Sequence, residues 1–211
     1  QRLLPSVTTA FDLLTGSIGQ IAPAKDSGPL TVSCAGTLIM RWLIPRLHRF
    51  HQANPDVEVR LSATDNNSEL SFGDNDIAIR FGVPPWPAYL CAHKLFSESI
   101  GPVCTPDYVR RTRLTKPADL RRATLLHTET RPFAWADWCA AIGLSQIDIH
   151  SGQRFEHFYF MLQAAASGLG VAISPAEAIV RDDMDAGRLA APFGFLTTGR
   201  DYAVLIEARR Q

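Results

Sequence analysis

The chain has 211 residues, of which 46% are hydrophobic and 20% are charged. Such a chain can bury a core as one large domain or two small ones, and its composition is typical of a globular protein. Its 21 Lys and Arg residues balance 21 Asp and Glu residues, which argues against a module that neutralises many DNA phosphates. Neither a membrane-spanning apolar run nor a signal peptide is evident, which favours a cytoplasmic location without a membrane partner.

The first segment of the chain has the periodicity of an amphipathic helix. Apolar residues recur at steps of three and four from Leu3 to Ile21, which predicts a helix over residues 1–21. Two interpretations stay open: the helix packs on its own domain, or it forms a coiled coil with a second copy. Residues 22–29, rich in Pro, Gly and Ser, predict a linker.

A strand, a helix and a second strand follow the linker. Residues 30–34 and 57–61 read as strands, and the apolar spacing from Leu38 to Phe50 predicts a helix between them. Pro45 is expected to kink that helix or to begin a new first turn. Parallel strands joined by a helix form an α/β sheet, whose ligand sites lie beyond the carboxyl ends of the strands. Residues 34–38 are therefore expected at a site.

The remaining pattern predicts a second unit of the same kind. Helices are expected to end at Gly143 and Gly168, because glycine commonly closes a helix. The expected strands are 76–81, 99–104, 125–128, 153–155, 170–175 and 201–206, and the expected helices are 135–142 and 158–167.

The sequence carries no sign of catalysis or of a bound metal. GxSxG, HExxH, P-loop and GxGxxG phrases are all absent, so we expect no enzyme, although a triad assembled from distant residues is recognised only by geometry. The four cysteines, Cys34, Cys91, Cys104 and Cys139, form no CxxC pair, which predicts no metal and no cofactor. They are interpreted as small buried hydrophobes, with a redox pair as the alternative.

Four segments, taken in order, resemble the effector-binding domains of LysR-type transcription regulators. The segments are residues 30–33 followed by 43–59, then 76–80, 102–106 and 164–175. Residues 76–82 and the pair Trp135 and Trp138 look like the branch that contains the glycine-cleavage activator and the chromosomal β-lactamase regulator. The resemblance covers nearly the whole chain.

The resemblance implies an α/β fold of two Rossmann-like subdomains joined by two crossover strands, as in periplasmic binding proteins, preceded by an N-terminal linker helix. It assigns residues 1–21 to that linker and dimerisation helix, 28–104 with 205–211 to subdomain I, and 105–204 to subdomain II. The family usually continues into a final helix beyond the point where this sequence stops.

The implied function is to sense a small, anionic effector in the cleft between the subdomains. DNA would be bound through a winged helix-turn-helix that is absent from this sequence, by a homodimer or homotetramer, and RNA polymerase is a further candidate partner. The alternative function is a periplasmic-type solute-binding receptor with the same two-lobed fold. The amphipathic first segment speaks against that receptor, because such a protein closes on its ligand as a monomer.

The candidate ligand residues follow from the strand ends and from this resemblance. Thr37 leads, because a hydroxyl and backbone N–H groups at a helix start can hold a carboxylate; the alternative is that Thr37 only caps the helix. Arg80 and Phe81 either pair with an acidic group or bridge the subdomains. A ring at His157 or Phe158 favours a smaller or aromatic ligand, and the alternative is an exposed His without a role. The complete set is Thr37, Leu38, Arg80, Phe81, Cys104, Thr105, Thr128, Glu156, His157 and Phe158.

Overall fold

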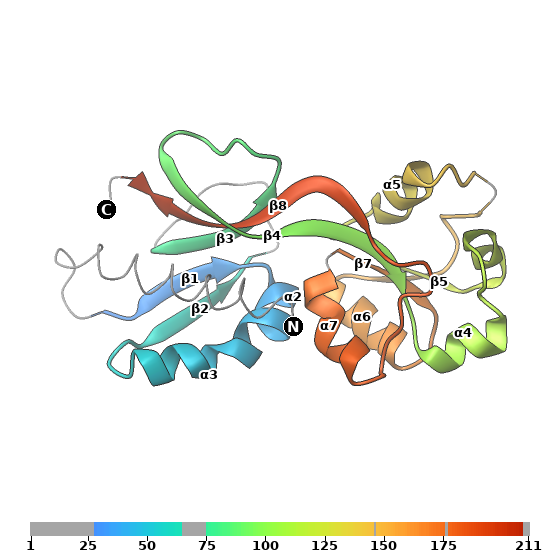
Figure 1. Cartoon of the computed structure of the whole chain (residues 1–211), viewed down its shortest axis with the longest axis horizontal. Helices are drawn as coiled ribbons and strands as arrows, with labels where there is room; N and C mark the ends of the chain where they lie inside the picture. The colour runs from blue at the N-terminus through green and yellow to red at the C-terminus, as the bar shows by residue number, and fades with distance from the viewer. Residues whose placement is uncertain (1–27, 65–74, 146, 176, 209–211) are drawn as a thin grey trace. The chain divides into compact units, whose positions relative to one another are not determined.

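The computed structural model of the chain describes residues 28–64, 75–145, 147–175 and 177–208. The helix expected over residues 1–21 lies outside these described residues. The chain forms two compact units: unit 1 comprises residues up to 97 together with 199–211, and unit 2 comprises residues 98–198. The chain passes between the units along two long strands, β4 (Leu90–Val103) and β8 (Leu196–Glu207), drawn in green and red (Figure 1). The α/β class and the two crossover strands expected from the sequence are confirmed.

The sheet of unit 1 has the strand order β2-β1-β3-β8. Strand β1 (Leu30–Cys34) runs parallel to β2 (Val59–Ala63) and to β3 (Ile77–Gly82), whereas β3 and β8 are antiparallel. The parallel arrangement confirms the predicted strand, helix and strand. The carboxyl ends of β1, β2 and β3 therefore lie along one edge of the sheet.

The helical segment after β1 changes its winding twice. It begins as α2 (Gly36–Leu38), widens into the π-helical η1 (Ile39–Leu43), and continues as α3 (Ile44–Ala53). Pro45 lies in the first turn of α3, so the second of the two expectations for this proline is correct. Proline has no N–H to donate and its ring crowds the carbonyl four residues earlier, which accounts for a wider turn directly before it.

Unit 2 has the strand order β4-β7-β5-β6. Strand β5 (Leu125–Thr128) is parallel to β6 (Gln153–Phe155) and to β7 (Val171–Ser174), whereas β7 is antiparallel to β4. The predicted helices appear as α5 (Ala134–Ala141) and α6 (Phe158–Ala166). The second α/β unit expected from the sequence is thus confirmed.

Two aromatic residues organise the core of unit 2. Trp135 and Trp138 pack edge to face, with ring centroids 6.2 Å apart, and both are buried. The Trp135 indole donates a hydrogen bond of 3.0 Å to the Leu126 carbonyl, which satisfies its only donor. The two tryptophans therefore hold α5 on the sheet.

The sequence patterns missed several elements. Strand β4 begins at Leu90 and not at Ser99, and β8 extends the expected strand at both ends. The part of β4 before Ser99 contains His93, Lys94 and Glu98, which conceal the alternation of a strand. The helical elements α4 (Pro106–Thr112), η2 (Pro117–Arg122) and α7 (Glu177–Asp185) were not predicted.

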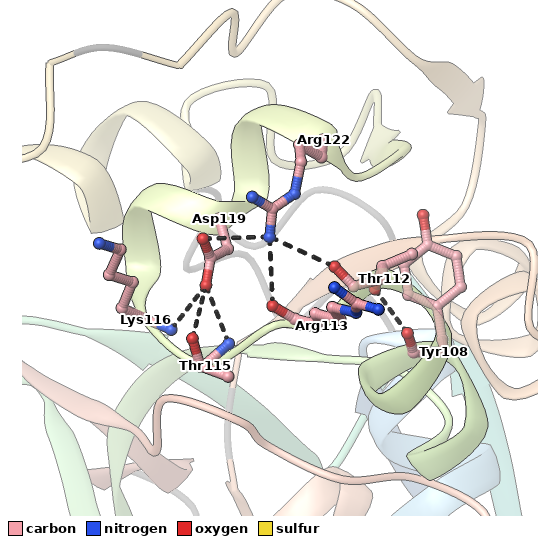
Figure 2. Close-up of polar contacts among 7 residues, drawn as sticks. All are labelled: Tyr108, Thr112, Arg113, Thr115, Lys116, Asp119 and Arg122. Atoms are coloured by element: carbon pink, nitrogen blue, oxygen red, sulfur yellow. Dashed lines mark hydrogen bonds and ion pairs between the residues drawn. The ribbon is translucent and has the colours of Figure 1, made fainter.

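The connection from α4 to η2 is stabilised by one carboxylate (Figure 2). Asp119 Oδ2 accepts hydrogen bonds from the Thr115 N–H, the Thr115 hydroxyl and the Lys116 N–H, at 3.0, 2.9 and 3.0 Å. The Arg122 guanidinium lies 3.2 Å from Oδ1. These donors favour the ionised form and lower the pKa of Asp119 to about 2. The Thr115 N–H has the largest effect.

Candidate functional site

The predicted site residues fall into two sets, one in each unit. Unit 1 contains Thr37, Leu38, Arg80 and Phe81, and unit 2 contains the remainder. Most of them lie at or near the carboxyl end of a parallel strand, which is the edge at which α/β sheets commonly bind ligands. Cys104 and Thr105 instead follow β4, which pairs with β7 in the antiparallel direction.

Thr37 lies at the start of the helical segment that follows β1. The N-cap of that helix is Ala35, and no side chain caps it, so the alternative that Thr37 serves as the cap is wrong. Thr37 is buried, and its hydroxyl makes no hydrogen bond to any residue that the structure describes. Leu38 beside it is buried in the core, so its side chain is not available to a ligand.

Arg80 is a buried cation within unit 1. Its side chain is 3% exposed, and Nη1 donates to the carbonyls of Ser33 and Ile79, at 3.0 and 3.1 Å. Nη2 donates to the Ser33 hydroxyl at 3.0 Å. Burial lowers the pKa of Arg80, yet a guanidinium titrates so far above neutrality that it stays charged. Phe81, the next residue, packs on Tyr202 of β8.

The buried cysteines behave as apolar side chains. Burial raises the pKa of Cys34 to about 12, although the nearby Arg80 acts in the opposite direction. Burial also raises the pKa of Cys104 to about 12 and raises that of Cys139. Thiols with raised pKa values stay protonated at neutral pH, and the thiolate is the reactive form. These three residues therefore fit the interpretation as small hydrophobes better than the redox pair.

Two of the unit 2 candidates, Cys104 and Thr105, make contacts that stabilise the fold itself. The Thr105 hydroxyl accepts a hydrogen bond of 3.1 Å from the Tyr108 N–H and is the N-cap of α4. Cys104 exchanges backbone hydrogen bonds with Ala190, at 3.1 and 2.7 Å. Thr128, at the carboxyl end of β5, is buried and shares a hydrogen bond of 2.9 Å with the Thr130 hydroxyl. Of these three, Thr128 alone ends a parallel strand.

The start of α6 separates the last three candidates from one another. Glu156 is exposed, whereas Phe158 is buried at 7% exposure and is part of the core. His157 is the N-cap residue of α6, half-buried, and stacks on Tyr159 with ring centroids 5.1 Å apart. The ring that is available at this helix start is therefore that of His157 and not that of Phe158.

The sequence did not reveal a buried charge cluster in unit 2. Glu98 of β4 is fully buried, and its Oε1 lies 2.6 Å from Arg131 Nη1. The Thr198 hydroxyl donates a hydrogen bond of 2.6 Å to Oε2. A glutamate between two serines resembles a surface residue, so no local pattern could have found this ion pair.

Two further features concern only the residues that the structure describes. None of their helices is long and apolar enough to cross a membrane. No group of three or more His, Cys, Asp and Glu side chains in the same residues is arranged to hold a metal ion.

Known regulators are similar to this chain over nearly its whole length. It is 40% identical over 210 residues to the HTH-type transcriptional regulator TrpI of Pseudomonas aeruginosa, covering 99% of this chain and 71% of that protein. It is 34% identical over 197 residues to the glycine cleavage system transcriptional activator of Escherichia coli, covering 93% of this chain and 64% of the activator. The second comparison agrees with the branch expected from the sequence.

Solved structures support the same assignment. The AmpR effector binding domain from Citrobacter freundii matches with a TM-score of 0.72 and 25% identity, over 88% of this chain and 90% of that one. The AmpR effector domain of Pseudomonas aeruginosa matches with a TM-score of 0.70 and 31% identity, over 87% of each chain. The family model of the LysR substrate binding domain matches residues 23–211. The chain therefore belongs to the LysR substrate-binding domain family.

Proposed function

We propose that this chain is the effector-sensing domain of a LysR-type transcription regulator, and that its effector is a small anion bound in the cleft predicted between its subdomains. The observation that carries the proposal is the family match over residues 23–211. The most similar relatives described above are named as transcriptional regulators and an activator. Those names favour a regulator over the solute-binding receptor and over an enzyme.

The geometry of each unit supports a ligand at the strand ends. In unit 1, Thr37 follows the carboxyl end of β1, and Arg80 and Phe81 lie near the carboxyl end of β3. In unit 2, β5 ends at Thr128 and β6 ends directly before Glu156 and His157. Binding sites in parallel α/β sheets form at such ends because the loops there are not used to build the sheet.

The proposed negative charge of the effector follows from the helix start in unit 1. The first amides of a helix have no acceptor within that helix, and they carry partial positive charge. Beside them lies the Thr37 hydroxyl, which has no partner among the described residues. A carboxylate or phosphate would satisfy both kinds of donor.

The relatives' names also support the proposed partners. Because TrpI is an HTH-type regulator and this chain spans 71% of its length, we infer that DNA is bound through a helix-turn-helix domain outside these residues. Assembly as a homodimer or homotetramer, and contact with RNA polymerase, are further parts of the proposal. A ligand can act on such an assembly only if it binds two conformations with different affinity.

A thermal-shift screen of the 211-residue chain tests the proposal. Amino acids, aromatic acids and cell-wall fragments are the compounds to test, because a ligand specific for the folded state raises the Tm. We expect a hit whose Tm shift grows with concentration and falls by at least half in Thr37→Val. Thr197→Val is the matched control, because Thr197 is an exposed threonine of β8. A hit that is equally strong in Thr37→Val would contradict the assignment of Thr37.

A further inference from the structure

Unit 1 contains a buried positive charge that is neutralised by no carboxylate of the described residues. Among the described residues, Arg80 takes part in no ion pair, and its three hydrogen bonds go to uncharged oxygens of Ser33 and Ile79. Two carboxylates beside β3 have other partners: Asp76, directly before the strand, accepts from Thr31, and Asp201, opposite Gly82, lies 2.8 Å from the Lys94 ammonium. Buried charges in folded proteins are normally paired, because leaving water is unfavourable for an isolated ion.

Two of the guanidinium donors of Arg80 have no acceptor among the described residues. A guanidinium has five N–H donors, and both of those on Nη1 and one on Nη2 are occupied. The remaining donors are Nε–H, which is buried without a partner, and the second N–H of Nη2. In a guanidinium, Nε–H is parallel to one N–H of Nη2, and such a pair forms the fork that matches two oxygens of a carboxylate or phosphate.

Ser33, which accepts two of the Arg80 hydrogen bonds, lies just before a helix start in the sequence. Ser33 and Cys34 are the last residues of β1, and Thr37 and the first amides of the helix follow directly. Cys34 is near Arg80 but does not neutralise it, because burial keeps the thiol protonated. Arg80 is thus a buried positive charge whose own Nε–H has no acceptor.

We propose that Arg80 is the residue of unit 1 that recognises the negative charge of the effector. Its Nε–H and Nη2–H would bind a carboxylate or phosphate group of the ligand. This inference rests on the proposed sensing function and names the head group that the ligand presents. Because Arg80 is 3% exposed, the anion reaches it only after the side chains that cover it have moved. Binding is therefore coupled to a local rearrangement, which a sensor requires.

Titration of the 211-residue chain with simple anions tests the inference. The probes are sodium phosphate and sodium acetate at up to about 20 mM, a range in which general salt effects on burial are small, balanced with sodium chloride at pH 7. We expect at least one of the two to raise the Tm with a saturating dependence. The stronger anion indicates whether the natural head group is a phosphate or a carboxylate.

Three variants decide whether Arg80 is responsible for the rise in Tm that the anion causes. Arg80→Gln should abolish the response, whereas Arg60→Gln should keep it, because Arg60 is an exposed arginine of the same unit. Arg80→Lys keeps the charge but loses the fork, so anion affinity should fall about tenfold or more. Circular dichroism in chloride establishes that each variant is folded, and Arg80→Lys decides the matter if Arg80→Gln does not fold.

The outcomes separate this inference from the proposed function. The inference is overturned if neither anion stabilises the unchanged chain, or if Arg80→Lys binds as tightly as the unchanged chain does. It is also overturned if an effector found in the screen stabilises Arg80→Gln fully, and the sensing function then still stands. Binding of phosphate through Arg80 with no effector in any screen would instead count against the sensing function.

Discussion

The two units treat their buried charges differently. In unit 2 the Glu98 carboxylate is fully buried, and it meets both Arg131 and the Thr198 hydroxyl within its own unit. In unit 1 the Arg80 guanidinium is almost as deeply buried but meets only neutral oxygens. A charge that is paired internally contributes to a fixed structure, whereas a charge without a counterion remains available to a ligand of opposite sign. This contrast is the reason for proposing the anion site in unit 1.

The largest effect is expected from Arg131→Met, which would break the pair in unit 2. The variant leaves the Glu98 carboxylate buried without its cation, and such a loss destabilises proteins by about 3–5 kcal/mol. The measurement is the free energy of unfolding in urea. The double variant Glu98→Gln with Arg131→Met should recover most of the loss, since no charge is then left unpaired. A single variant as stable as the unchanged chain would show that the pair is unimportant.

A smaller loss is expected from Arg80→Met in unit 1. This change removes the donors to Ser33 and Ile79 but leaves no charge behind, so we expect a loss of about 1–3 kcal/mol in the same urea measurement. Arg60→Met, at an exposed position, should change stability by less than about 0.5 kcal/mol. If Arg80→Met were as damaging as Arg131→Met, the contrast between the units would disappear.

The smallest effect is expected from Asp119→Asn, because asparagine keeps one oxygen acceptor in the turn. The folded pKa of about 2 lies below the ordinary value of 3.8, so the carboxylate stabilises the fold above pH 3.8. That stabilisation is lost as the pH falls towards 2. The Tm difference between the variant and the unchanged chain should therefore be largest near neutrality and shrink in acid. A difference that does not vary with pH would contradict the role of the charge.

The fold was largely predictable because local patterns and tertiary packing agree. The predicted strand 125–128 coincides with β5, and α6 is followed by Gly168 with φ +79, a conformation that favours glycine. Strand β4 was half missed because its early residues alternate poorly. Packing between distant segments, and not local pattern, makes Leu90 and Glu98 parts of one strand.

The site was less predictable than the fold, because position along a strand does not determine which way a side chain is used. Leu38 and Phe158 were placed near strand ends, yet both side chains belong to the core. The Thr105 hydroxyl is occupied as a helix cap. The significance of Arg80 depends on the absence of a carboxylate partner among the described residues, and such an absence is visible only in three dimensions.

The buried, protonated thiols allow local unfolding of each unit to be followed by chemical labelling. Cys34 lies in unit 1, and Cys104 and Cys139 lie in unit 2. An alkylating reagent attacks a thiolate that it can reach, so these residues become labelled only when the surrounding unit opens. Pulsed alkylation followed by peptide mass spectrometry would therefore yield separate opening rates for the two units of one unmodified chain, with and without an effector.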